Sequence, residues 1–142
     1  MIRIIAVALF ACVAAAAGPA AAQCGNAYDQ MVAEARATRE SLDAIERYAP
    51  ADGPARVTSS LVTRARATAR SVDRALEYGV GRPRYRGRDS SWEEDWYAHL
   101  GQLNADLDAF MPRLRVSAQL SPAERAELRR IVTGIAVTGC RP

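Results

Sequence analysis

The side chains with the clearest capacity for chemistry are one histidine and the carboxylate four positions before it. His99 is the only histidine of the 142-residue chain, and Asp95 precedes it. On a helix this spacing puts both side chains on one face, where a carboxylate can orient an imidazole for proton transfer or metal binding. A protein metal site needs three or four ligands, and no second histidine exists. We therefore expect a boundary or surface histidine and no metal site, with Asp95 and His99 as the candidates if a metal is carried.

A methionine offers a second kind of chemistry together with this histidine. Some periplasmic four-helix bundles hold a b-type haem between a Met of one helix and a His of another, and the architecture predicted below resembles those cytochromes. Met31 and His99 would supply the pair here. The last predicted helix offers no histidine, and a lone core methionine usually only packs. We expect no cofactor, and we keep as an alternative a metal or b-type haem carrier that uses Met31, Asp95 and His99.

A segment rich in arginine offers anion binding. Residues 81–88 alternate four arginines around one tyrosine, namely Arg82, Arg84, Tyr85, Arg86 and Arg88. Guanidinium groups grip phosphates, lipopolysaccharide or an acidic protein face. The plainer interpretation is a solvated loop, because charge runs are usually that and acidic residues follow directly. The candidate partner is an envelope protein or an anionic envelope component; the export signal described next argues against nucleic acid.

The N-terminus has the layout of a secretory signal. Arg3 precedes an apolar run over 4–17, Gly18-Pro19 breaks it, and three alanines end at Ala22. This pattern predicts cleavage after Ala22 and removal of residues 1–22. The apolar run is shorter than the roughly 20 residues of a membrane span, and no later segment is long enough. We expect a mature chain of residues 23–142, one domain, located in the periplasm or secreted.

Two cysteines remain after this cleavage. Cys24 and Cys140 lie near the start and the end of the mature chain. In an oxidising compartment an isolated pair indicates a disulfide. Closing a loop of about 100 residues stabilises a fold by roughly 4.7 kcal/mol in the chain-entropy treatment. A lipid anchor on Cys24 is the alternative, although Gln23 before it is larger than such signals carry. We predict that a disulfide joins the termini.

Hydrophobic periodicity predicts four helices and no convincing strand. Their ranges are 27–49, 54–78, 91–111 and 121–138, with the Arg-rich loop at 81–90. Pro54 suits the first turn of the second helix. Ser91 with Glu94, and Ser121 with Glu124, have the spacing of capping boxes. Two predicted core stripes are Tyr28, Met31, Ala35, Thr38, Leu42, Ile45 and Ala49 on the first helix and Val57, Leu61, Ala65, Thr68, Val72, Ala75 and Gly79 on the second.

The signs of the charges favour one arrangement of these helices. All 19 basic residues are arginine, and successive segments alternate in sign: net −3 over 23–53, +7 over 56–88, −6 over 89–110 and +4 over 111–142. Exposed ion pairs contribute only about 0–1 kcal/mol each, but the pattern disfavours misordered packing. An even number of helices also brings the two cysteines to one end. We predict an all-α, single-domain, antiparallel up-down-up-down four-helix bundle.

The first two predicted helices resemble each other. Residues 32–48 and 62–78 are identical at eight of seventeen positions, thirty residues apart. Shared small residues on the packing stripe explain part of this similarity. A duplication and convergence within an Ala- and Arg-rich composition both remain open, and two copies are too few for a solenoid.

The chain has no nucleophile elbow, phosphate loop or Cys-x-x-Cys pair, so we predict that it is not an enzyme. The expected function is binding or envelope support by a small exported helical protein. Its contacts would be the Arg-rich loop or the uncharged stretch 131–140. A chaperone-like envelope stress protein is a further alternative.

Overall fold

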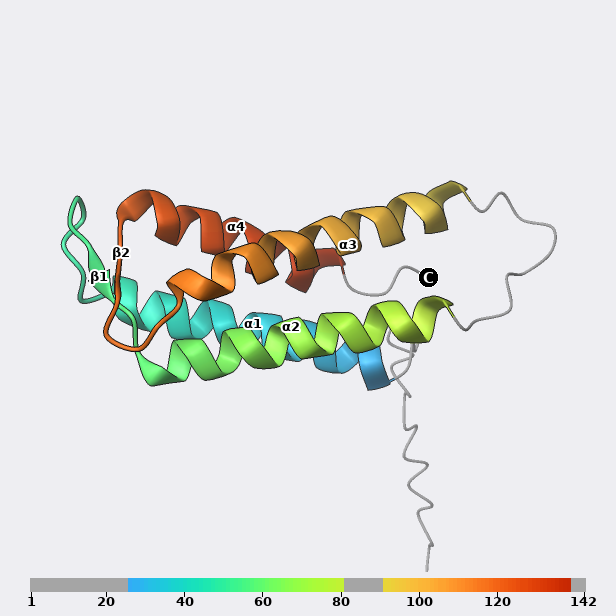
Figure 1. Ribbon diagram of the computed structural model, residues 1–142, viewed down its shortest axis with the longest axis horizontal. Coiled ribbons are helices and arrows are strands. Elements are labelled where there is room, and N and C mark those ends of the chain that lie inside the picture. The colour runs from blue at the N-terminus through green and yellow to red at the C-terminus, as the bar shows by residue number, and fades with distance from the viewer. Residues whose placement is uncertain (1–25, 81–90, 139–142) are drawn as a thin grey trace, which may run out of the picture.

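The computed structural model describes residues 26–80 and 91–138, and for residues 79–80 and 91–93 it describes the backbone alone. Four helices account for most of these residues (Figure 1): α1 Asn26–Glu46, α2 Ser59–Val80, α3 Ser91–Phe110 and α4 Pro122–Thr138. A 3₁₀ turn, Met111–Arg113, follows α3, and two short strands, β1 Ala55–Arg56 and β2 Gln119–Leu120, lie between helices. The predicted all-α class with four helices is confirmed.

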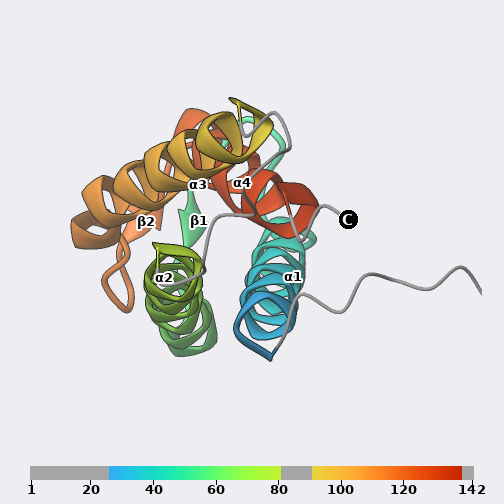
Figure 2. The same cartoon turned by 90° about the vertical axis from the view of Figure 1, so that its right-hand side faces the viewer.

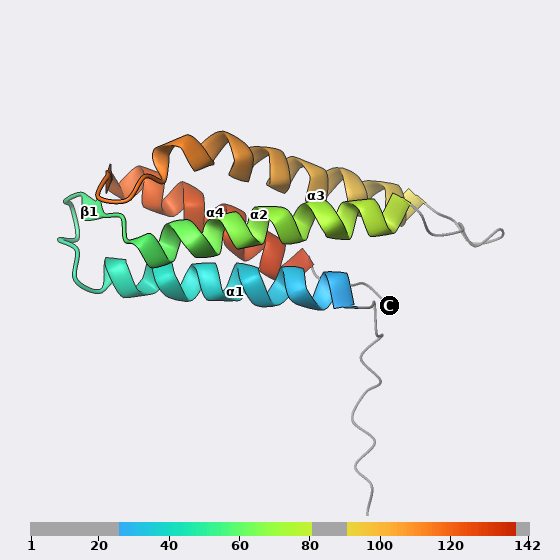
Figure 3. The same cartoon turned by 60° about the horizontal axis from the view of Figure 1, so that its bottom comes forward.

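The helices form two layers. α1 and α2 lie side by side, and α3 and α4 cover one face of that pair (Figure 2). Figure 3 shows α1 and α2 side by side, and the two helices pack against each other. Each helix also packs against a member of the other layer, α1 against α4 and α2 against α3. The outer face of the α1/α2 pair therefore has no helix of this chain over it among the described residues.

Both predicted stripes lie in the core. On α1, Tyr28, Met31, Ala35, Thr38 and Leu42 are buried, whereas Ile45 and Ala49 are partly buried. The second stripe is buried from Val57 to Ala75 at every predicted position. On α3 and its extension, Leu100, Leu103, Leu107, Phe110 and Leu114 complete the apolar interior. The three-four spacing thus identified the inner faces of the helices correctly.

The predicted start of the second helix was wrong. Pro54 precedes β1, and α2 begins only at Ser59, because Thr58 caps it: the Thr58 hydroxyl accepts a hydrogen bond from the Leu61 amide at 3.2 Å. The preceding residues pair instead with the segment before α4, Ala55 opposite Leu120 and Arg56 opposite Gln119. The expected absence of strands was therefore also wrong, since an extended segment here satisfies backbone groups that a helix start would leave unpaired.

The capping box of α4 is confirmed. The Ser121 amide donates to Glu124 at 2.9 Å, and the Glu124 amide donates to the Ser121 hydroxyl at 3.3 Å. The Ser121 hydroxyl also donates to the Glu124 carboxylate, at 3.0 Å, and the hydrogen bonds that this carboxylate accepts from the Ser121 amide and hydroxyl lower the pKa of Glu124. The Ser91 side chain of the other predicted box lies outside the described residues.

Two helices end earlier than predicted. α1 ends at Glu46 and not at residue 49, and a turn follows in which the Tyr48 amide donates to the Ile45 carbonyl. α3 ends at Phe110, where the proline at 112 converts the next turn to a 3₁₀ helix. Pro50 and Pro112 limit these helices because a proline disfavours the helical conformation of the residue before it.

Several predictions fall on residues outside the described ranges. They are the signal sequence 1–22, the pairing of Cys24 with Cys140, and the Arg-rich loop 81–90. None of the helices in the described ranges is both long and apolar enough to cross a bilayer.

Candidate functional site

The α1/α2 interface is built around two threonines that occupy the same place in the internal repeat. The hydroxyls of Thr38 and Thr68 lie 2.7 Å apart, fully buried. Each hydroxyl also approaches the carbonyl four residues earlier, at 2.8 Å for Glu34 and 3.0 Å for Arg64. Aligned residues of the two helices therefore meet face to face at this point.

A second aligned pair meets nearby. Arg64 and Glu34 form an ion pair at 3.7 Å, and they too are thirty residues apart. Two helices whose equivalent residues contact each other are related by an approximate two-fold axis through those contacts. Rotation about this axis thus superposes each residue of α1 on the residue thirty positions later in the chain.

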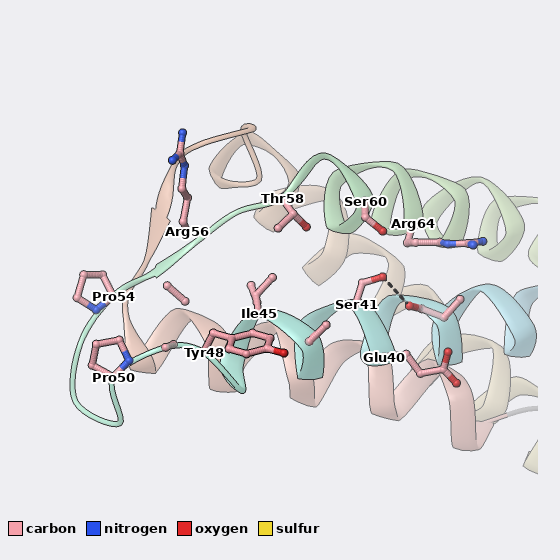
Figure 4. Close-up of a pocket in the computed structure, with 14 residues that line it drawn as sticks. Glu40, Ser41, Ile45, Tyr48, Pro50, Pro54, Arg56, Thr58, Ser60 and Arg64 are labelled. Carbon is pink, nitrogen blue, oxygen red and sulfur yellow. Dashed lines mark hydrogen bonds between the residues drawn. The ribbon is translucent and has the colours of Figure 1, made fainter.

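An open groove of about 820 Å³ lies at one end of this helix pair. Figure 4 shows Ser41, Ile45 and Tyr48 on the α1 side and Thr58, Ser60 and Arg64 on the α2 side. The turn that contains Pro50 and Pro54 closes the groove at its end. Small side chains leave this space open; besides the serines and Thr58 they include Ala37, Ala44 and Ala49.

An exposed aromatic ring borders the groove. Tyr48 is 85% exposed, the largest value among the large hydrophobic residues that the structure describes as exposed. Charges of both signs lie on the rim: Glu40 on α1 and Arg64 on α2. The Arg56 guanidinium turns away from the groove and donates to the Ser117 hydroxyl at 3.1 Å. The groove thus presents an exposed aromatic ring, small apolar side chains and charged groups of both signs.

A buried arginine holds the turn that closes the groove. Arg125 of α4 is only 7% exposed, and its guanidinium donates to the carbonyl of Gly53 at 2.8 Å and of Pro50 at 3.4 Å. Its buried Nε has no partner in the part of the chain that is described. A Cβ added at Gly53 would lie 2.9 Å from the Pro50 Cβ, so the turn is also sterically tight. Together these contacts fix the closed end of the groove.

The adjacent end of α1 is fixed by ion pairs. Arg129 donates to Asp43 at 2.6 Å and also to Glu46. Burial alone would lower the pKa of Arg129, but the hydrogen bonds that it donates to these carboxylates raise it. Since the three side chains connect α4 to the last turn of α1, they position Tyr48 just beyond it.

The opposite end of the α1/α2 pair is filled by aromatic rings. Tyr28 lies edge-on to Tyr78, with ring centroids 6.0 Å apart, and packs against Trp96 at 5.4 Å. The hydroxyls of Tyr28 and Tyr97 lie 3.2 Å apart. Trp96 also donates to the carbonyl of Thr138 at 3.2 Å. The start of α1 and the end of α4 therefore meet at one indole ring.

The residues predicted for metal or haem binding occupy different environments. Met31 is completely buried in the core, whereas Asp95 and His99 are exposed. No group of three or more His, Cys, Asp or Glu within the described ranges could hold a metal ion. The structure thus brings none of the predicted candidates together in a described site, and Arg82, Arg84, Tyr85, Arg86 and Arg88 lie outside the described residues.

The uncharged end of the last helix is largely covered. Ile131, Val132, Ile135 and Ala136 are buried, and Val137 is exposed. A single exposed valine is ordinary on a protein surface and does not form a patch.

Sequence reasoning missed the groove. The signal that could have found it lies in the thirty-residue offset of the repeat, which aligns Ala44 with Arg74 within the two copies and, just before them, Tyr28 with Thr58. Large side chains at one end of the helix pair are matched by small ones at the other. The size difference between aligned side chains indicates a groove only once it is known that the two helices pack against each other.

The described groove lining contains hydroxyls, one carboxylate and two arginines, and no histidine or cysteine. No protein family matches the chain, and no curated protein or solved structure is detectably similar to it. The geometry of this groove is therefore the starting point for a function.

Proposed function

We propose that this protein is an exported helical binding protein of the bacterial envelope, located in the periplasm or secreted, with no enzymatic activity of its own. The observation that carries this proposal is the open groove between α1 and α2, with Tyr48 exposed at its edge. Binding sites are typically concave and mostly apolar, with a few polar groups that fix orientation. The groove has these features, and Arg125 and Arg129 fix its walls.

The proposed architecture is an antiparallel up-down-up-down bundle whose termini are joined by a disulfide between Cys24 and Cys140. Support comes from Trp96, which contacts Tyr28 near the start of α1 and Thr138 at the end of α4. Each cysteine is four residues or fewer from one of these contacts, within reach of an extended chain at about 3.5 Å per residue. Export after removal of residues 1–22 would supply the oxidising compartment that the bond requires.

The Arg-rich loop is proposed as a separate contact for an anionic envelope component. It connects α2 to α3, whereas the groove lies where α1 connects to α2. Two surfaces at different connections allow one protein to hold a ligand in the groove and to associate with the envelope.

A pull-down from the envelope fraction tests both surfaces. The intact mature protein is compared with an Ala44→Arg variant, which fills the groove, and with a variant in which Arg82, Arg84, Arg86 and Arg88 are all changed to Ser. We expect Ala44→Arg to abolish capture of the groove ligand, and the loop variant to abolish only association with anionic components. Unchanged capture by both variants would refute the proposal, as would turnover of a substrate that is lost on His99→Ala.

The alternatives have less support. A metal or haem carrier would need Met31 and His99 to face one site, but one is buried and the other exposed. A chaperone that cradles unfolded clients would need a broad concave surface, whereas the described helices enclose a closed core.

A further inference from the structure

The two ends of the α1/α2 pair are equivalent in sequence but differ in what fills them. The contacts between Thr38 and Thr68 and between Glu34 and Arg64 place an approximate two-fold axis at the centre of the pair. The groove at one end therefore corresponds to the place at the other end where Tyr28 and Arg74 lie, which we call the closed end. The side chains at the closed end therefore indicate which chemical groups the groove can bind.

At the closed end the space is taken by an aromatic ring and a long cation. Tyr28 lies edge-on to Tyr78 at 6.0 Å. Arg74 extends across the helix pair and donates to the Gln30 side chain at 3.4 Å. Edge-to-face contacts of this kind contribute beyond the burial of their surface.

At the open end each of these groups has a small counterpart. The positions equivalent to Tyr28, Gln30 and Arg74 are occupied here by Thr58, Ser60 and Ala44. The position equivalent to Tyr78 is still a tyrosine, Tyr48. Among the described residues, Tyr48 thus has no aromatic ring at the place that Tyr28 takes beside Tyr78. At the other end, the positions equivalent to those small side chains carry a second ring and longer polar chains.

We propose that the groove binds an aromatic side chain of an extended peptide segment, with that ring packed edge-on against Tyr48. This inference rests on the proposed binding function and names the ligand class. The groove is open and, at about 820 Å³, much larger than one ring, so that a chain can pass along it. Glu40 and Arg64 on opposite walls suit a peptide of mixed polarity better than a purely anionic lipid.

Nuclear magnetic resonance of the isotope-labelled mature protein tests the inference directly. The probes are two acetylated and amidated pentapeptides, Gly-Ser-Tyr-Ser-Gly and Gly-Ser-Leu-Ser-Gly. We expect saturable shifts of the amides of Ala44, Ile45 and Ser60 with the tyrosine peptide, and affinity lower by roughly tenfold with the leucine peptide, as expected for a lost ring pair. Equal affinity of the two peptides at the groove would overturn the aromatic preference.

Variants identify the contact. Tyr48→Ala should weaken binding of the tyrosine peptide roughly tenfold, whereas Tyr48→Phe should preserve it, because the ring and not the hydroxyl makes the edge contact. Ala44→Arg with Ser60→Gln recreates the pair that closes the other end and should abolish binding. Ala33→Arg, an exposed substitution on α1 outside the groove lining, is the matched control and should bind normally. Unchanged binding by the Tyr48→Ala variant would refute the proposed contact.

The outcomes also separate this inference from the function it rests on. If neither peptide shifts the groove residues but the envelope pull-down still depends on Ala44, the groove binds a ligand of another class and the aromatic proposal is wrong. If the pull-down is also insensitive to Ala44→Arg, the proposed binding function itself fails.

Discussion

The two buried threonines at the centre of the α1/α2 pair give the sharpest energetic prediction. Thr38 and Thr68 contribute two hydroxyl protons, but three contacts compete for them: one between the hydroxyls and one from each to its own helix. One hydroxyl must therefore donate to the other, which donates to a backbone carbonyl. Valine has nearly the same shape and a similar helix propensity, so Thr→Val removes the hydroxyl alone.

The magnitudes follow from this arrangement. Either single Thr→Val change removes the bond between the hydroxyls and leaves the other buried oxygen without a donor, at a cost of about 1 kcal/mol. The double change strands no polar group, and replacing both partners by apolar groups is nearly neutral. We therefore expect a coupling free energy of about 2 kcal/mol between the two sites.

Equilibrium urea unfolding of the wild type, both single variants and the double variant measures this coupling. Thr63→Val, at an exposed position of α2, is the control and should change the free energy of unfolding by less than about 0.5 kcal/mol. Additive effects of the two single changes, within about 0.5 kcal/mol, would refute the direct contact and the two-fold relationship of the helices.

Two further predictions concern the covering helices. Gly101→Ala should stabilise the fold by about 1 kcal/mol, because nothing lies within 4 Å of the added Cβ and alanine is the better helix former. Gly134→Ala should instead leave the fold unchanged or destabilise it by up to about 2 kcal/mol, because its Cβ would lie 2.9 Å from a Leu103 methyl group; thermal unfolding that ranks the two variants in the opposite order would contradict this packing. Since the folded-state pKa of Glu124 is lowered, its stabilising effect is present above the unfolded pKa and is lost as the pH falls through the folded pKa. Glu124→Gln should therefore be less stable than the wild type near neutral pH, with a difference that shrinks in acid; a difference independent of pH would refute the role of the charge.

Sequence patterns within one helix correctly predicted those features of the fold that depend on neighbouring residues alone, namely the buried face of a helix and its capping. The stripe through Met31 and Leu42 identified the inner face of α1, because burial on a helix repeats every three to four residues. Ser121 and Glu124 identified the start of α4, since a capping box is complete within four residues. The same reasoning assigned Met31 to the core as the plainer alternative to haem ligation.

The start of α2 could not be predicted in this way. A proline at position 54 is a good local signal for a helix start. The competing signal is the pairing of Ala55 with Leu120, which lies far away in the sequence. Contacts of this range depend on how the helices pack and leave no periodic pattern, so tertiary structure overrode the local preference.

The candidate site could not be predicted from the sequence for a related reason. Tyr48 reads as an ordinary residue at the end of a helix, and no motif marks Ala44 or Ser60. Their meaning depends on which residues face each other across the two-fold axis. The repeat supplies the alignment, but only the contact between Thr38 and Thr68 shows that its copies pack against each other.

Site-specific photo-crosslinking from the edge of the groove tests the central claim most directly. A benzophenone amino acid replaces Tyr48 in the full-length chain expressed in bacterial cells, and in a matched control it replaces Arg47, which is exposed but does not line the groove. We expect a defined adduct in the cell envelope from position 48, absent from position 47 and lost when Ala44→Arg is added. No adduct from position 48, or the same adducts from both positions, would contradict it.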